Sequence, residues 1–415
     1  MRPSLPLAAA AALIAALPAT TAPAHAAPPR PGPAAARPSP APLDQVNGAI
    51  PGQYIVSLAA GVTPARVTTG TGVTPLYTYG RARGGFAARL NPSQVEMIRQ
   101  RPGVVAVEQD ATVSLPRESD SASVSTPGRA TGATAGAPGA RVPWGLTRIN
   151  HREPGGTGYS VKATGAKVRS YIIDSGIELN HPEFGGRAET GVSFVQDGRG
   201  AQDCAGHGTH VAGVVGGRTV GVARQTHLVS VRVFDCAGAA SNSALIAAIN
   251  WVAEHARPPA VANLSMSGPK SAAVDRAVEG LADAGVFPVV AAGNGDVDAC
   301  TVSPSGARGA FPVGAVDRRD RKAAFSNWGE CVALSAPGVN IRSAFPGGGY
   351  RELSGTSMAA PFATGVAALY KDTHGDTPSD TLAHWLTGNA TPGIDTTRNG
   401  AASGTPPLLL YTGGL

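Results

Sequence analysis

The residue types needed for hydrolysis by an activated serine occur in four short stretches of this sequence. These stretches are "YIIDSG", "GHGTHVAG", "VVAAGNG" and "SGTSMAAP", and they contain, in that order, Asp174, His207, Asn294 and Ser357. A histidine can take the proton of a nearby serine hydroxyl, and a carboxylate can hold that histidine in the required tautomer. An amide N–H can then bind the oxyanion that the attack creates. The sequence therefore offers one candidate for each task of peptide-bond hydrolysis.

Each of these residues also has an ordinary structural explanation. Asp174 and Asn294 precede Ser-Gly and Gly, which is typical of turns. His207 could belong to a loop that caps a helix, and Ser357 to a plain helix N-cap. A helix that begins at Ser357 would, however, surround the hydroxyl with free backbone N–H groups and the positive end of the helix. The four stretches have to be judged together.

Two other classes of protein compete with a serine hydrolase. Cys204, His207 and His210 are spaced three apart and could ligate zinc, as in a zinc hydrolase. No H-E-x-x-H motif or paired C-x-x-C motif accompanies them, and Cys204 could instead join a disulfide. A catalytically inactive binding protein on the same scaffold would lack at least one of the four candidate residues, and none is missing.

The elements that must position these residues are predicted from alternating strand and helix patterns after Pro143. Apolar strand-like runs occupy residues 168–176, 227–235, 260–265 and 286–294, and helical patterns occupy 241–256 and 272–285. This alternation predicts an α/β fold, with a parallel sheet that has helices on both faces. In such folds the functional groups collect beyond the carboxyl ends of the strands, where Asp174 and Asn294 stand.

The first part of the chain is predicted to be a series of processing segments. Residues 1–26 have Arg2, an apolar core and the cleavage pattern Ala24-His25-Ala26, which indicates a secretory signal peptide and a secreted protein. A Pro/Ala-rich segment follows at 27–49. Residues 50–114 form a small α+β domain, residues 115–141 a linker that contains or adjoins a processing site, and residues 142–415 the domain that carries the candidate site.

Composition excludes some partners. The net charge is only +6 and the basic residues are scattered, so we expect no nucleic-acid partner. No segment after the signal peptide has about 18 uninterrupted apolar residues, so we expect no membrane partner. The four cysteines are Cys204, Cys236, Cys300 and Cys331. An even number in an exported protein suggests disulfides, and three pairings are open; the sequential pairing closes two loops of similar length.

Together the motifs resemble the subtilisin-like serine proteases, and within them the proteinase K-like group that includes aqualysin-type enzymes. "VPWGLTRI", "HPEFGGRA", "RPPAVANLS" and "FSNWGECV" also match, so the resemblance covers about residues 142–412. Residues 51–113 resemble the inhibitory pro-segment of that family, a small ferredoxin-like α+β domain. The resemblance implies a self-processing zymogen that becomes a serine endopeptidase, with its own pro-domain as intramolecular inhibitor. It also implies the sequential disulfides. We expect the protein to be a monomer.

The resemblance assigns a role to each candidate residue. Ser357 would be the nucleophile, His207 the general base, Asp174 the residue that orients His207, and Asn294 an oxyanion donor. The protein or peptide substrate would bind as an extended strand, with an apolar or aromatic side chain preferred before the scissile bond. The implied substrate-binding residues carry no charge and are Gly238, Ser265, Met266, Ser267, Gly268, Ala291, Ala292 and Gly293.

The sequence departs from the family pattern at several positions. Phe362 replaces a usual histidine, which we expect to alter packing only, and Ser267 replaces a glycine, which we expect to narrow the cleft. Ala333, Thr147 and Asn150 replace acidic residues of calcium sites. Catalysis is expected to need no cofactor. Calcium dependence is not inherited, and a structural calcium site built from other ligands is left open.

Overall fold

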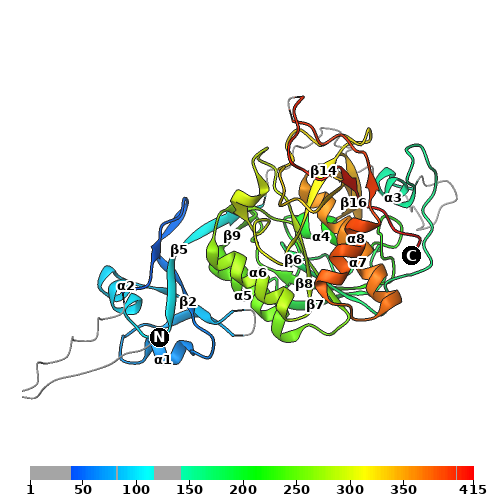
Figure 1. Cartoon of the computed structure of the whole chain (residues 1–415). Helices are drawn as coiled ribbons and strands as arrows, with labels where there is room; N and C mark the ends of the chain where they lie inside the picture. The colour runs from blue at the N-terminus through cyan, green and yellow to red at the C-terminus, as the bar shows by residue number, and fades with distance from the viewer. Residues whose placement is uncertain (1–38, 81–82, 116–141, 399) are drawn as a thin grey trace, which may run out of the picture. The chain divides into compact units, whose positions relative to one another are not determined.

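A computed structural model describes residues 39–80, 83–115, 142–398 and 400–415 (Figure 1). The predicted signal peptide and most of the predicted linker lie outside the described residues. Residues Pro40–Leu415 form one compact unit, which contains both the predicted α+β domain and the α/β domain.

The smaller domain is built on a sheet with the strand order β1-β5-β2-β4-β3. Its strands are β1 (Leu43–Asp44), β2 (Ala49–Leu58), β3 (Pro75–Tyr79), β4 (Gly85–Arg89) and β5 (Val104–Ser114), and its helices are α1 (Pro64–Thr68) and α2 (Pro92–Arg99). Helix α2 starts at Pro92 because Asn91 and Gln94 form a reciprocal capping box and Pro92 opens the first turn. Val56, Phe86, Ile98 and Val107 form part of its core.

The larger domain contains a nine-stranded sheet with the order β18-β19-β15-β14-β12-β10-β6-β8-β7. The strands are β6 (Arg169–Asp174), β7 (Ala188–Ser193), β8 (His227–Arg232), β10 (Ala260–Leu264), β12 (Phe287–Ala291), β14 (Phe311–Val316), β15 (Leu334–Pro337), β18 (Thr391–Pro392) and β19 (Leu408–Leu409). The pairs from β7 to β19 are parallel, as predicted, whereas the short edge strand β18 runs antiparallel to β19.

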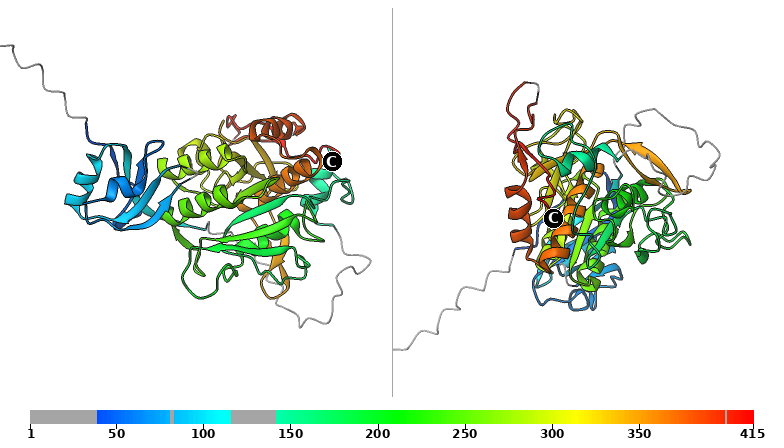
Figure 2. Two further views of the ribbon diagram at one scale, coloured as in Figure 1. Left: turned by 90° about the horizontal axis from the view of Figure 1, so that it is seen from below. Right: turned by 90° about the vertical axis from the view of Figure 1, so that its right-hand side faces the viewer.

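Helices cover both faces of this sheet (Figure 1, Figure 2). On one face lie α4 (His207–Gly216) and α7 (Thr356–His374); on the other lie α5 (Asn242–His255) and α6 (Ala272–Asp283). Neighbouring strand residues point to opposite faces, so Ile172 and Val289 pack in the core with α4 and α7, while Ile173 and Val290 pack in the core with α5 and α6. This two-sided burial explains why the strands read as continuous apolar runs.

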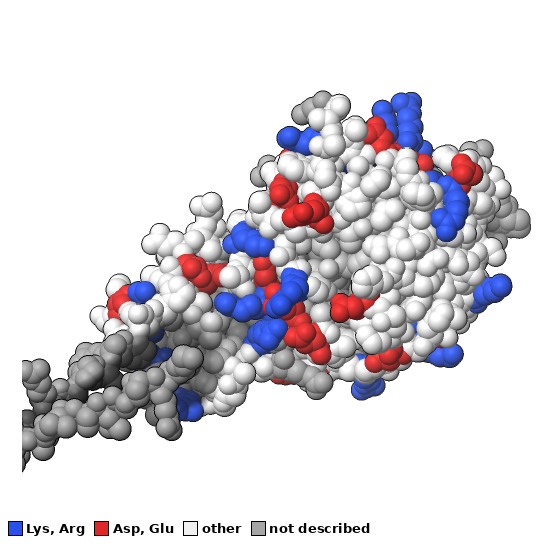
Figure 3. All heavy atoms as spheres, viewed as in Figure 1, with Lys and Arg blue, Asp and Glu red and all other residues white. Residues whose placement is uncertain are grey.

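The remaining elements lie around the sheet. They are α3 (Trp144–Asn150), α8 (Ser379–Gly388), a 3-10 turn (Ala299–Thr301), and the short strands β9 (Ala239–Ser241), β11 (Gly268–Pro269), β13 (Val302–Ser303), β16 (Ile341–Phe345) and β17 (Gly349–Leu353). Among the described residues, no helix combines the length and the hydrophobicity that crossing a bilayer requires. On the face drawn in Figure 3, basic and acidic side chains are interspersed.

Candidate active site

Asp174 and His207 form a hydrogen-bonded pair at the carboxyl edge of the large sheet. Asp174 is the last residue of β6, and His207 is the first residue of α4. Asp174 Oδ1 lies 2.7 Å from His207 Nδ1 and also accepts a 2.7 Å bond from the Ser175 N–H. The carboxylate is fully buried. Gly208 allows this close approach, because a Cβ there would lie 2.1 Å from the Gly176 carbonyl oxygen.

Ser357 lies in the first turn of α7, at the same edge of the sheet. Its Oγ is 3.2 Å from the carbonyl oxygen of Ser265, and the Ser265 hydroxyl donates a 2.8 Å bond to the carbonyl of Ser357. These two bonds fix the start of α7 beside the end of β10. Strand β10 pairs with β6, and α4 packs against both α7 and β6, so the three catalytic candidates belong to one contiguous set of elements.

Asn294, three residues beyond β12, is oriented by the start of α7. Its Oδ1 accepts a 2.9 Å bond from the Thr356 N–H and a 2.7 Å bond from the Thr356 hydroxyl. Because both bonds use the amide oxygen, the amide Nδ2 remains available on the other side, toward Gly355. Sequence reasoning found Asn294 but not the role of Thr356 in holding it.

The end of the small domain lies in the place predicted for a substrate strand. Residues 112–114 of β5 pair antiparallel with β9, and the Leu115 N–H donates a 2.8 Å bond to the Gly238 carbonyl. Val113 lies on the other side against Gly268, where a Cβ would be 3.3 Å from its Cγ2. The segment 112–115 therefore runs between β9 and β11 in an extended conformation.

A cavity of about 390 Å³ opens beside Asn294. Its lining consists of Ser267, Gly268, Asn294, Gly295, Val297, Val302 and Asn327. Ser267 and Gly268 belong to the predicted substrate-binding set, whereas Val297, Val302 and Asn327 do not. Asn327 shapes this wall because its Oδ1 accepts the N–H groups of Gly295 and Val297. No local pattern around residue 327 indicated this, because the contact joins loops 30 residues apart.

The predicted substrate-binding residues differ in whether they reach this cavity. Met266, Ala291 and Ala292 are fully buried in apolar clusters and are not among the residues that line the cavity. Gly293 does lie under the pocket wall, since a Cβ there would be 2.3 Å from Asn327 Nδ2 and 2.7 Å from Ser267 Oγ. Its φ of +106° also favours glycine.

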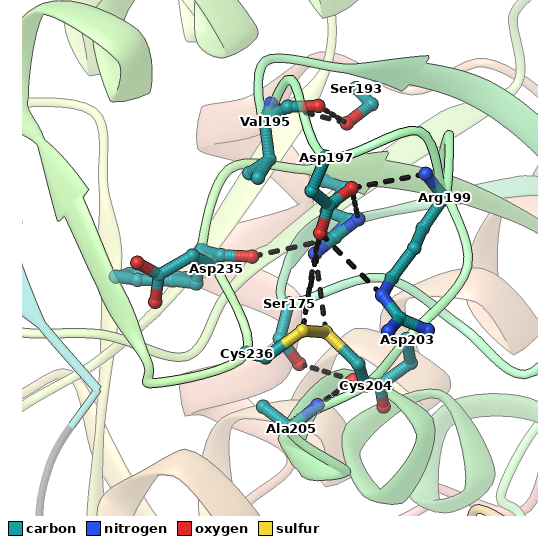
Figure 4. Close-up of polar contacts among 12 residues, drawn as sticks. Ser175, Ser193, Val195, Asp197, Arg199, Asp203, Cys204, Ala205, Asp235 and Cys236 are labelled. Atoms are coloured by element: carbon teal, nitrogen blue, oxygen red, sulfur yellow. Dashed lines mark hydrogen bonds and ion pairs between the residues drawn. A yellow bond between two sulfur atoms is a disulfide. The ribbon is translucent and has the colours of Figure 1, made fainter.

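The two disulfides join Cys204 to Cys236 and Cys300 to Cys331, which is the sequential pairing. Figure 4 shows the first of them next to Asp197. This pairing removes Cys204 as a thiolate ligand. His210 is also committed, because its Nε2 lies 2.9 Å from the Ile341 carbonyl and burial lowers its pKa to about 3. The described geometry therefore does not support the zinc site.

The positions that depart from the family pattern are filled by packing and hydrogen bonds. Phe362 is buried and its ring lies against Gly145, where a Cβ would come within 2.4 Å. The Asn150 side chain accepts the Ser160 N–H at 2.9 Å and donates to Thr412 Oγ1 at 3.1 Å. Calcium takes about six to eight oxygen ligands, usually with carboxylates among them, and residues 147 and 150 supply no carboxylate. The side-chain oxygen of Asn150 already accepts the Ser160 N–H.

Comparison with known proteins places these observations in context. The profile of the subtilase family matches residues 165–405, and the profile of peptidase inhibitor I9 matches residues 53–116. Alkaline serine exoprotease A of Vibrio alginolyticus is 41% identical over 329 residues, covering 79% of this chain and 58% of that protein. The extracellular serine proteinase of Thermus sp. (strain Rt41A) is 41% identical over 346 residues, covering 83% and 78%.

Two further relatives extend the comparison. The subtilisin-like serine protease AsES of Sarocladium strictum is 38% identical over 389 residues, covering 91% of this chain and 94% of that protein. The crystal structure of a cold-adapted subtilisin-like serine proteinase superposes with a TM-score of 0.63 and 42% identity, covering 66% of this chain and 99% of that one.

Proposed function

The chain belongs to the subtilase family, and on that premise we propose that it is a secreted serine endopeptidase with an Asp174–His207–Ser357 triad. The observation that carries the proposal is the 2.7 Å contact between Asp174 Oδ1 and His207 Nδ1, on elements that pack directly against the helix of Ser357. The name of one relative, the extracellular serine proteinase of Thermus sp., supports export, as does the predicted signal peptide.

The geometry suits acyl transfer. With its Nδ1–H donated to Asp174, His207 presents Nε2 as the base that removes the proton of Ser357 Oγ. The oxygen attacks the peptide carbonyl carbon, and the C–N bond breaks as His207 returns the proton to the leaving amine. Water then attacks the acyl-enzyme with the same base, which releases the carboxylic acid and restores Ser357. The proposed steps use the residues of this chain, the peptide and one water molecule.

Asn294 is the proposed oxyanion donor, together with the Ser357 N–H. Thr356 holds the amide oxygen by two bonds, so Nδ2 keeps its direction as negative charge develops on the substrate oxygen. Loss of such a donor in subtilisin lowers kcat by roughly 10²–10³-fold, and we expect the same order for Asn294→Ala. Because the oxyanion exists only near the transition state, the change should leave KM nearly unaltered.

We propose that residues 50–114 act as the intramolecular inhibitor and that the chain processes itself within 115–141. Two buried carboxylates of β5 support this docking. Glu108 accepts bonds from the Ser271 hydroxyl and the Ala273 N–H at the start of α6. Asp110 accepts the Ser243 N–H at 3.0 Å at the start of α5. Both carboxyl groups supply hydrogen-bond acceptors to N–H groups at the start of a helix, where no intrahelical acceptor exists.

The pocket beside Asn294 supports a broad preference for apolar or aromatic side chains before the scissile bond. Val297 and Val302 form its walls, and none of the described residues that line it is charged. A peptide anilide with Phe before the scissile bond should therefore have a kcat/KM at least about tenfold higher than the Lys analogue, because the apolar walls leave an ammonium without a partner.

Labelling the nucleophile tests the whole proposal. A phosphonyl fluoride should modify Ser357 stoichiometrically and abolish hydrolysis, and mass spectrometry should place the adduct on the peptide that contains it. Ser357→Ala should accumulate as a precursor with residues 27–142 attached. Ser354→Ala is the matched control, because Ser354 lies in the same stretch but bonds the Asn340 N–H. Normal processing of Ser357→Ala in the absence of other proteases, or labelling elsewhere, would contradict the proposal.

A further inference from the structure

The carboxylate of Asp203 accepts five hydrogen bonds just before the helix that begins at His207. Its Oδ1 accepts from Ser175 Oγ and from the N–H groups of Ala205 and Gly206, each at 2.9 Å. Its Oδ2 accepts from the N–H and the hydroxyl of Thr209, at 2.9 and 2.6 Å. Figure 4 draws Ser175, Asp203 and Ala205 beside the Cys204–Cys236 disulfide. No Lys or Arg of the described chain forms an ion pair with Asp203.

This carboxylate replaces the side-chain cap that α4 lacks. Gly206 occupies the N-cap position with a φ of +94° and has no capping side chain. A larger residue cannot stand there, because its Cβ would lie 2.3 Å from the ring of Phe345. The free N–H groups of the first turn therefore need another acceptor, and Asp203 supplies it with a negative charge at the positive end of the helix.

Ser175 connects the same carboxylate to Asp174. The Ser175 hydroxyl donates to Asp203 Oδ1 and accepts the Gly208 N–H at 2.9 Å. Its own N–H donates to Asp174 Oδ1 at 2.7 Å, the oxygen that also contacts His207. A helix cap alone does not require the bond to Ser175, which lies beyond the end of β6. Through this network, the segments that carry Asp174 and His207 are both hydrogen-bonded to the Asp203 carboxylate, directly or through Ser175.

We propose that Asp203 is a positioning residue that sets the geometry of the Asp174–His207 pair. Its carboxylate holds the turn before His207 by accepting the Ala205 and Gly206 N–H groups. It also holds Ser175, the residue after Asp174, and the Ser175 hydroxyl in turn holds Gly208, the residue after His207. The inference rests on the proposed function, because it concerns how the general base is held. The Cys204–Cys236 disulfide assists by fixing the residue next to Asp203.

Asp203→Asn tests this role because it changes the charge and two bonds but little volume. An amide nitrogen in place of Oδ2 would face the two donors of Thr209, so the first turn of α4 must shift. A displacement of about 1 Å at a reacting group can cost on the order of 10²-fold. We expect kcat to fall about 10- to 100-fold, KM to change less than about twofold, and the low-field proton resonance of the His207–Asp174 bond to shift or broaden.

Asp372→Asn is the matched control. Asp372 also accepts backbone N–H groups of a loop, from Thr164, Gly165 and Lys167 at 3.2, 2.9 and 3.1 Å, but it lies on the C-terminal part of α7. The same substitution there should lower the unfolding temperature while kcat and the low-field resonance stay unchanged. An equal loss of kcat in both variants would mean that a general loss of stability explains the effect.

Ser175→Ala decides the question if Asp203→Asn fails to fold or to mature. It removes the link to Asp174 and leaves the bonds of Asp203 to the helix intact. We expect kcat to fall about 3- to 10-fold at constant KM. An unchanged kcat and resonance in either soluble variant would overturn the positioning role. If the wild-type protein is neither active nor labelled at Ser357 by phosphonyl fluoride, the proposed function itself is wrong. If the wild-type protein is active and labelled but the variants match it, only the positioning role of Asp203 is wrong.

Discussion

Thr356→Val should weaken catalysis through Asn294 without touching the triad. The Thr356 hydroxyl is buried, donates to Asn294 Oδ1 at 2.7 Å and accepts the Gly293 N–H at 3.1 Å. Valine replaces the hydroxyl with a methyl group of nearly the same size. Asn294 Oδ1 then keeps only the 2.9 Å bond from the Thr356 N–H, so the amide can rotate away from the oxyanion.

The size of the effect follows from the bonds that are lost. A net hydrogen bond contributes about 0.5–1.5 kcal/mol, and each 1.36 kcal/mol of barrier is a factor of ten in rate. We therefore expect kcat to fall about 3- to 10-fold. KM should stay constant because Asn294 acts on charge that develops in the transition state. The orphaned Gly293 N–H should also lower the free energy of unfolding by about 1–3 kcal/mol.

Steady-state kinetics on a peptide anilide, normalised by active-site titration, measure both parameters. Thr356→Ser keeps the hydroxyl and should retain kcat within about twofold, which makes it the control for the lost methyl group. In an Asn294→Ala background, Thr356→Val should have no further effect on kcat, because the two residues act as one unit. An unchanged kcat in the single variant, or additive effects in the double variant, would refute this reasoning.

Three further predictions concern the pro-segment and stability. Burial raises the pKa of Glu108, so this carboxyl group binds its proton more tightly in the docked pro-segment than in the free one. Inhibition, measured by titrating the enzyme with pro-segment, should therefore weaken as pH rises above about 4.5. Glu108→Gln should remove this pH dependence. Replacing both Cys204 and Cys236 by serine opens a loop with a sequence separation of 32 and should lower the unfolding free energy by about 3–4 kcal/mol, seen as faster thermal inactivation. Asp320→Ala leaves the buried Arg148 guanidinium without its 2.8 Å partner and should cost about 3 kcal/mol by calorimetry of the inhibited enzyme, with kcat unchanged.

Local patterns sufficed for the elements that carry the candidate site. The runs at 168–176 and 286–294 contain β6 and β12, because strands buried on both faces must be apolar throughout. The stretch after Ser357 became α7, because small apolar residues suit a helix packed closely on a sheet. Strands β7, β14, β15, β18 and β19 were not predicted, since runs of two to six residues carry little periodic signal.

The sequence by itself identified the candidate groups: a carboxylate, an imidazole, an amide and a hydroxyl, each at the end of an apolar strand or the start of an apolar helix. Those positions are local properties, readable from neighbouring residues. Only the tertiary structure decided which distant groups hold them. The bonds of Thr356 to Asn294, of Asn327 to the pocket wall and of Asp203 to Ser175 join segments that are distant in the sequence. A hydrogen bond needs its two atoms within about 3 Å, and for distant residues the chain topology decides which atoms come that close. The residues around either partner therefore do not reveal the contact.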